Sequence, residues 1–124
     1  MPLARTKRGR VRQVANWLRA EFPTPWPVRI SLLDLGNQER CYHGACSRRG
    51  RKLAIEVNHR APKYVMIGTL LHEWAHAMTW PVANLEESKP IDHDAEWGLA
   101  YARIVRAYED FDGWKTSRQY PETA

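Results

Sequence analysis

Cysteine is scarce in this 124-residue chain, which contains only Cys41 and Cys46. Two thiols with four residues between them are too few for the disulfide framework of a small secreted domain, and no other cysteine pair is present to complete a second zinc site. The sequence therefore predicts two free thiols and an intracellular protein, which we expect to be cytoplasmic.

Long apolar runs are also missing. No stretch reaches the roughly 18 residues that a membrane-spanning helix needs. Residues 1–12 are basic but carry no apolar segment of the kind found in a secretory signal. These absences predict that the protein has no membrane partner.

The composition is nevertheless that of a folded domain. Hydrophobic residues make up 44% of the chain, and six tryptophans and five tyrosines supply large side chains for a core. We expect a single domain over residues 1–124, with a flexible basic tail at 1–9 and an irregular tail at 114–124.

Positive charge is concentrated in the first half of the chain. Residues 1–60 hold thirteen lysines and arginines against four acidic residues, whereas residues 61–124 hold six against ten. The halves therefore carry net charges near +9 and −4, which together give +5. A basic half predicts contact with nucleic acid or another polyanion, although no nucleic-acid-reading motif accompanies it. The alternative is a solvated basic surface.

Hydrophobic periodicity predicts an α+β fold. In chain order, the predicted elements are a helix at 10–22, a strand at 28–33, a weaker strand at 39–46, a turn at 47–50, a strand at 51–58, and helices at 62–79 and 92–110. We expect the three strands to form a small antiparallel or mixed sheet. Pro62 suits the start of the central helix, and Trp80-Pro81 ends it.

The central helix contains the motif His72-Glu73-Trp74-Ala75-His76. Residues four apart lie on the same helical face, so both imidazoles can reach one metal ion. Glu73 then lies beside the metal, where a general base for a zinc-bound water is needed. The helix is apolar on nearly all sides, and polar groups buried in it need a partner such as a metal ion.

A catalytic zinc site needs three protein ligands and an open position. The downstream candidates are His93, Asp94 and Glu96, at the start of the last helix. Helical phase places His93 on the same face as Trp97 and Tyr101, a face that must turn toward the central helix. Glu96 lies on a less buried face. His93 is therefore the preferred third ligand, with Glu96 second and Asp94 third.

The remaining histidines carry weaker predictions. His59, just before the central helix, is a candidate to line the cleft, whereas His43 is expected to be a surface residue on the hairpin. A hydrolytic zinc site also needs a group that stabilises the oxyanion formed during hydrolysis, and the candidates for this role are Tyr64, Tyr101 and His59.

Two motifs occur at a defined spacing, with sixteen residues between His72-Glu73-x-x-His76 and His93-Asp94-Ala95-Glu96-Trp97. Together they resemble the SprT-like zinc metallopeptidases of the zincin class. Those proteins have H-E-x-x-H on a buried helix and a third histidine in an H-G-x-x-aromatic segment that opens the next helix. The resemblance covers roughly residues 28–110. Asp94 stands where the family usually has glycine, and the four-cysteine zinc ribbon of many relatives is not in this sequence.

The motif and the resemblance together predict a zinc-dependent metallopeptidase. We expect one zinc ion per chain on His72, His76 and His93, with Glu73 as the general base. A peptide substrate is expected to lie extended beside an edge strand. The main alternative is a non-catalytic module that binds nucleic acid or protein and keeps the metal for structure, although such a site has no need of Glu73. Hydrolysis of a bond other than a peptide is a third possibility.

Overall fold

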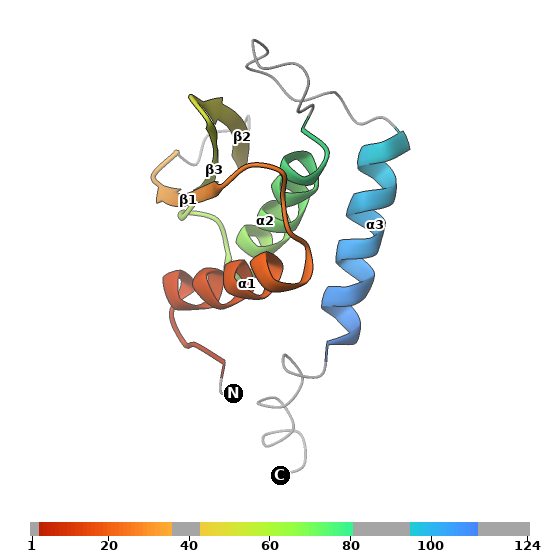
Figure 1. The fold of residues 1–124 in the computed structure, drawn as a ribbon. Coiled ribbons are helices and arrows are strands. Elements are labelled where there is room, and N and C mark those ends of the chain that lie inside the picture. Colours follow the sequence, from red (N-terminus) through yellow and green to blue (C-terminus); the bar gives the residue numbers. More distant parts are fainter. Residues whose placement is uncertain (1–2, 36–42, 81–94, 112–124) are drawn as a thin grey trace.

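The computed structural model describes residues 3–35, 43–80 and 95–111, and within them the fold is α+β, as the sequence predicted. The elements in chain order are α1 (Lys7–Glu21), β1 (Val28–Leu33), β2 (Gly44–Arg49), β3 (Lys52–Asn58), α2 (Lys63–Met78) and α3 (Ala95–Asp110). Helix α2 lies between the sheet and α3, and α1 packs against α2 as well (Figure 1). The motif helix is thus at the centre of the fold.

Helix α1 begins at Lys7, three residues before the predicted start. The hydroxyl oxygen of Thr6 accepts a hydrogen bond from the backbone N–H of Gly9 at 3.0 Å, which caps the helix. This capping brings residues 7–9, which we assigned to the basic tail, into the helix. Periodicity alone could not locate this start, because the first turn contributes no buried apolar side chain.

The sheet is mixed, with the strand order β1-β3-β2. Strand β1 pairs with β3 in parallel, and β2 pairs with β3 antiparallel, so the purely antiparallel alternative is wrong. The predicted turn at 47–50 is also largely wrong, because β2 continues to Arg49. The chain reverses only at Gly50, whose φ of 65° lies in the left-handed region that glycine adopts readily.

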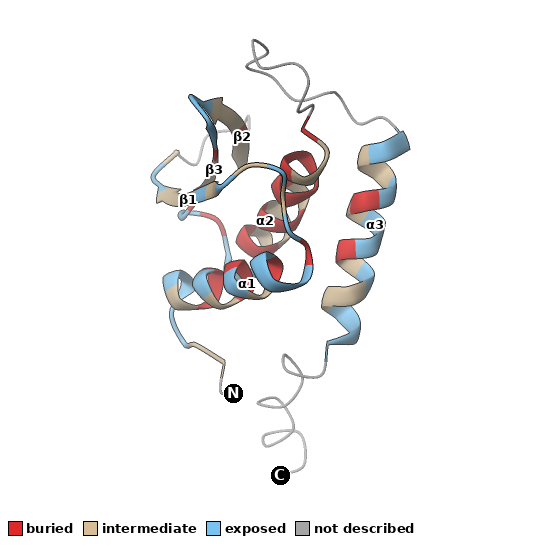
Figure 2. Cartoon of the chain, in the orientation of Figure 1, coloured by how far each residue is buried: buried red, intermediate tan, exposed pale blue. Residues whose placement is uncertain are grey.

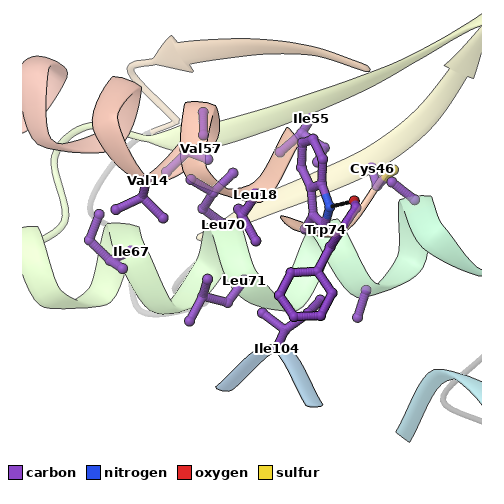
Figure 3. Close-up of a cluster of buried hydrophobic side chains, with 14 of the residues drawn as sticks. Val14, Leu18, Cys46, Ile55, Val57, Ile67, Leu70, Leu71, Trp74 and Ile104 are labelled. Atoms are coloured by element: carbon purple, nitrogen blue, oxygen red, sulfur yellow. Dashed lines mark hydrogen bonds between the residues drawn. The ribbon is translucent and has the colours of Figure 1, made fainter. Parts of the chain in front are cut away.

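The hydrophobic core lies between the sheet and the helices. Leu53, Ile55 and Val57, the alternating residues of β3, are fully buried in this core. Figure 3 shows Ile55 and Val57 in one cluster with side chains of α1 and α2. Helix α2 carries nine buried residues and is red over most of its length in Figure 2. This near-continuous burial matches the apolar character that the sequence indicated for the central helix.

Helices α2 and α3 begin and end close to their predicted bounds. Pro62 is the N-cap of α2, and Thr79 is its C-cap. Helix α3 ends at Asp110, as predicted, while residues 92–94 of its predicted start lie outside the described residues, as does the predicted tail at 114–124. Across the described ranges, no helix combines the length and the apolar character needed to cross a membrane.

Candidate metal centre

His72 and His76 lie side by side on α2, as their four-residue spacing requires. Their ring centres are 5.2 Å apart, and the ring planes are inclined at 65°. A zinc ion bonded to one nitrogen of each ring at about 2.0–2.1 Å lies about 3.2 Å from each ring centre, so tetrahedral geometry separates the ring centres by about 5.2 Å. The observed pair therefore fits two ligands of a single zinc ion.

Helix α3 covers the two imidazoles with aromatic rings. The indole of Trp97 is stacked on His76, with ring centres 5.3 Å apart, and meets His72 edge-on at 4.9 Å. Tyr101 stacks on Trp97 and contacts the edge of His72. The indole N–H of Trp97 also donates a 3.4 Å hydrogen bond to the backbone carbonyl of His72. The predicted inward face of α3 is thus confirmed for Trp97 and Tyr101.

Glu73 is buried beside the histidine pair. Glu73 is only 8% exposed, and its Oε2 lies 3.8 Å from Nε2 of His72. Burial away from water raises the pKa of the Glu73 carboxyl to about 7 in the metal-free chain. The carboxyl thus sits against the imidazole of His72 without the solvation that normally keeps a glutamate acidic.

Behind Glu73 lies the buried thiol of Cys46, on β2. Burial, and then the negative charge of Glu73, raise the pKa of this thiol to about 12. A thiol with so high a pKa stays protonated at neutral pH in the metal-free chain. Cys46 is therefore a structural neighbour of the site, as the prediction of free thiols implies.

A hollow of about 340 Å³ opens onto the motif. It is lined by residues from the start of β2, from α2 and from α3: His43, Gly44, Gly68, Thr69, His72, Glu73 and Tyr101. Both Glu73 and His72 therefore face a space that a substrate can enter. The three elements that form the hollow come from distant parts of the sequence.

His43 lines this hollow, a position that the sequence did not predict. We expected a surface residue on the hairpin, and the side chain is indeed exposed, but it lies at the site. Nothing in the local sequence distinguishes it, because its position depends on how β2 packs against α2. Its backbone carbonyl accepts a hydrogen bond from the N–H of Asn58, which anchors the residue to the end of β3.

Of the three candidates for oxyanion stabilisation, only Tyr101 lines the hollow. Tyr64 is 78% exposed and borders a different, apolar hollow between α2 and α3. His59 is exposed after the end of β3, and its carbonyl accepts a hydrogen bond from Nζ of Lys7. The expectation that His59 lines the cleft is therefore wrong.

Gly44 determines how closely β2 approaches α2. A Cβ atom built on Gly44 would clash with the backbone oxygen of Glu56 and would lie 2.7 Å from Cγ2 of Thr69, one turn before His72. Only a residue without a side chain permits this approach. The hollow thus takes its width from a glycine that no motif identified.

The third ligand stays a prediction. His93 and Asp94 lie outside the described residues, and Glu96 is an exposed residue of the first turn of α3. Within the described ranges, no group of three histidine, cysteine, aspartate or glutamate side chains is arranged to hold a metal ion. His72 and His76 are therefore two candidate ligands, and a complete zinc site requires a further one.

No protein-family model matches the chain, and searches of curated proteins and of solved structures also find no match. The likeness to SprT-like peptidases therefore depends on the two motifs alone.

Proposed function

We propose that the protein is a zinc-dependent metallopeptidase. The observation that carries this proposal is the position of Glu73, beside the imidazole of His72 and on the wall of the hollow that His72 also lines. A metal held only for structure needs ligands, whereas a carboxylate next to the ligands is what hydrolysis requires. This position favours catalysis over the alternative of a non-catalytic metal-containing module.

His72 and His76 would hold the zinc ion, with His93 as the proposed third ligand. Zinc, when bound, supplies Lewis-acid chemistry that lowers the pKa of a water molecule and polarises the carbonyl of the scissile bond. Glu73 would act as the general base that takes a proton from the attacking water, and then as the acid that gives it to the leaving amine. Trp97 packs on both imidazoles and holds their orientation.

A substrate peptide would lie along the free edge of β2. Because the carbonyl of His43 points to β3, the backbone groups of the alternate residues Gly44 and Cys46 point away from it. No strand in the described part of the chain pairs with this edge. An extended peptide added there would pass Glu73 at the mouth of the hollow.

The adjoining apolar hollow, of about 540 Å³, would take a hydrophobic side chain of the substrate. It shares Gly68 and Tyr101 with the hollow at the motif, and Ile67, Leu71 and Val105 line its apolar part. Both hollows therefore meet along one turn of α2. We expect a preference for peptides with a large apolar residue near the cleaved bond.

The test compares the wild-type protein with Glu73→Gln in metal content and in hydrolysis of a broad peptide library. We expect about one zinc ion per chain in both proteins, and a loss of activity by several orders of magnitude in the variant. Glu21→Gln, an exposed carboxylate at the end of α1, is the matched control and should retain full activity. Equal activity in Glu73→Gln would favour the non-catalytic module.

A further inference from the structure

A second hollow, of about 470 Å³, lies between α1 and β1, away from the motif. Its rim carries four exposed arginines, three from α1 and one from β1: Arg8, Arg12, Arg19 and Arg29. Arg12 follows Arg8 by four residues, and Arg19 follows Arg12 by seven. The three arginines of α1 therefore form a stripe along one side of the helix. The floor includes the apolar side chains of Ile30 and Leu32.

Strand β1 presents to this hollow an edge with which no strand pairs in the described part of the chain. The carbonyls of Pro27 and Leu33 accept hydrogen bonds from Leu53 and His59, so the odd-numbered backbone groups of β1 point to β3. The even-numbered groups, those of Ile30 and Leu32, therefore point outward. Arg19 confirms this direction at one end, because its Nη2 donates a 3.0 Å hydrogen bond to the outward carbonyl of Val28.

Three of the arginines beside this edge form no ion pair within the described ranges. The ion pairs there involve other residues, and none includes Arg8, Arg12 or Arg29. An unpaired strand edge can hydrogen-bond to another extended chain, and the positive charge beside it favours a negatively charged partner.

We infer that the groove between α1 and β1 binds an extended acidic peptide segment of a partner protein, which adds to the sheet as a strand beside β1. Side chains of an added strand alternate between the two faces of the sheet. Acidic residues at every second position would all lie on one face, where those facing α1 would meet Arg8 and Arg12, whereas Arg29 borders the other face. The inference is independent of the proposed peptidase activity.

The backbone edge favours a peptide over a nucleic acid. Ile30 and Leu32 each offer one outward N–H donor and one outward C=O acceptor, and a peptide backbone matches both. A phosphodiester backbone offers only acceptors, so the two carbonyls would face negatively charged oxygens. The described groove also contains no aromatic side chain on which bases could stack.

The test measures binding of fluorescein-labelled probes to the full chain by fluorescence anisotropy at low ionic strength. The probe is a capped peptide of alternating glutamate and valine, about ten residues long, which is a typical upper strand length. The control probes are the same peptide with lysine for glutamate, the acidic peptide with every backbone nitrogen methylated so that neither of its edges can pair, and an oligothymidylate of equal length. We expect binding of the unmodified acidic peptide alone.

Two protein variants and residue-resolved amide exchange complete the test. Arg8→Gln with Arg12→Gln should weaken binding by about fivefold or more, whereas Arg51→Gln with Lys52→Gln, which removes equal charge at the β2–β3 turn, should leave it unchanged. Bound peptide should slow exchange of the Ile30 and Leu32 amides by about tenfold or more. Equal binding of the lysine or methylated peptide, or binding of oligothymidylate without amide protection, would overturn the inference.

Discussion

The indole N–H of Trp74 donates a 2.8 Å hydrogen bond to the backbone carbonyl of Phe22, across 52 residues of sequence (Figure 3). Trp74 is only 1% exposed and fills the core between α1, the sheet and α2. It lies between Glu73 and His76 in the motif, on the opposite side of the helix from His72 and His76. Trp74 therefore fixes the position of the helix that carries the candidate ligands.

Trp74→Phe should lower the free energy of unfolding by about 2–4 kcal/mol, because it leaves the buried carbonyl of Phe22 without its donor and opens a cavity. Urea unfolding measures this loss. Trp97→Phe is the control: its 3.4 Å hydrogen bond is weaker and the residue is only half-buried, so the loss should be smaller. Equal losses in the two variants would contradict the role of Trp74.

Two glycine-to-alanine substitutions should change stability in opposite directions. Gly44→Ala should destabilise the fold by about 2 kcal/mol or more, because the new methyl group meets Thr69 and the backbone of Glu56. Gly68→Ala, in α2, meets no heavy atom within 4 Å and should stabilise the helix by about 1 kcal/mol. Thermal unfolding of both variants measures these changes in stability. If Gly44→Ala left the stability unchanged, β2 would be able to move away from α2.

The sequence revealed elements with a regular hydrophobic period and missed relationships between elements. Strand β3 and helix α2 were predicted nearly to the residue, because their buried side chains repeat at two and at about 3.6 residues. The parallel pairing of β1 with β3 was not fixed, since the same alternation is compatible with either strand direction. Hydrophobic pattern identifies a buried face but does not identify the partner strand.

In the candidate site, too, residues within one element were predicted, whereas residues brought in by packing between elements were not. His72, Glu73 and His76 were identified because their spacing within one helix determines their geometry. His43 and Gly44 were missed because they reach the site only through the packing of β2 on α2. A residue that reaches a site only because two distant elements pack together leaves no local pattern in a single sequence.

The metal-free protein should become less stable as pH rises through about 7. Burial raises the pKa of the Glu73 carboxyl from 4.5 to about 7, so the folded chain favours the protonated form. The stabilisation is fully present below pH 4.5, the unfolded value, and is lost as pH rises to the folded value, with a maximum change of about 3 kcal/mol.

Urea unfolding with a chelator present, at several pH values from about 5 to 8, measures this change. Glu73→Gln cannot ionise at this position, so it should lack the Glu73-dependent loss, and its stability should increasingly exceed that of the wild type as pH rises over that range. If the stabilities of the two proteins stay parallel with pH, the buried carboxyl does not titrate as its environment indicates.

His93→Ala should lower zinc affinity far more than Glu96→Ala. Glu96 is an exposed residue in the first turn of α3, whereas His93 was preferred because its helical phase matches that of Trp97, whose ring covers the two histidines. Changes beyond the ligands themselves already cost about tenfold to a hundredfold in metal affinity, so loss of a ligand should cost at least a hundredfold. Competition with a chromophoric chelator measures both affinities. Zinc loss in Glu96→Ala, with tight binding retained in His93→Ala, would transfer the third ligand to Glu96 and remove one of the two motifs on which the resemblance to SprT-like peptidases depends.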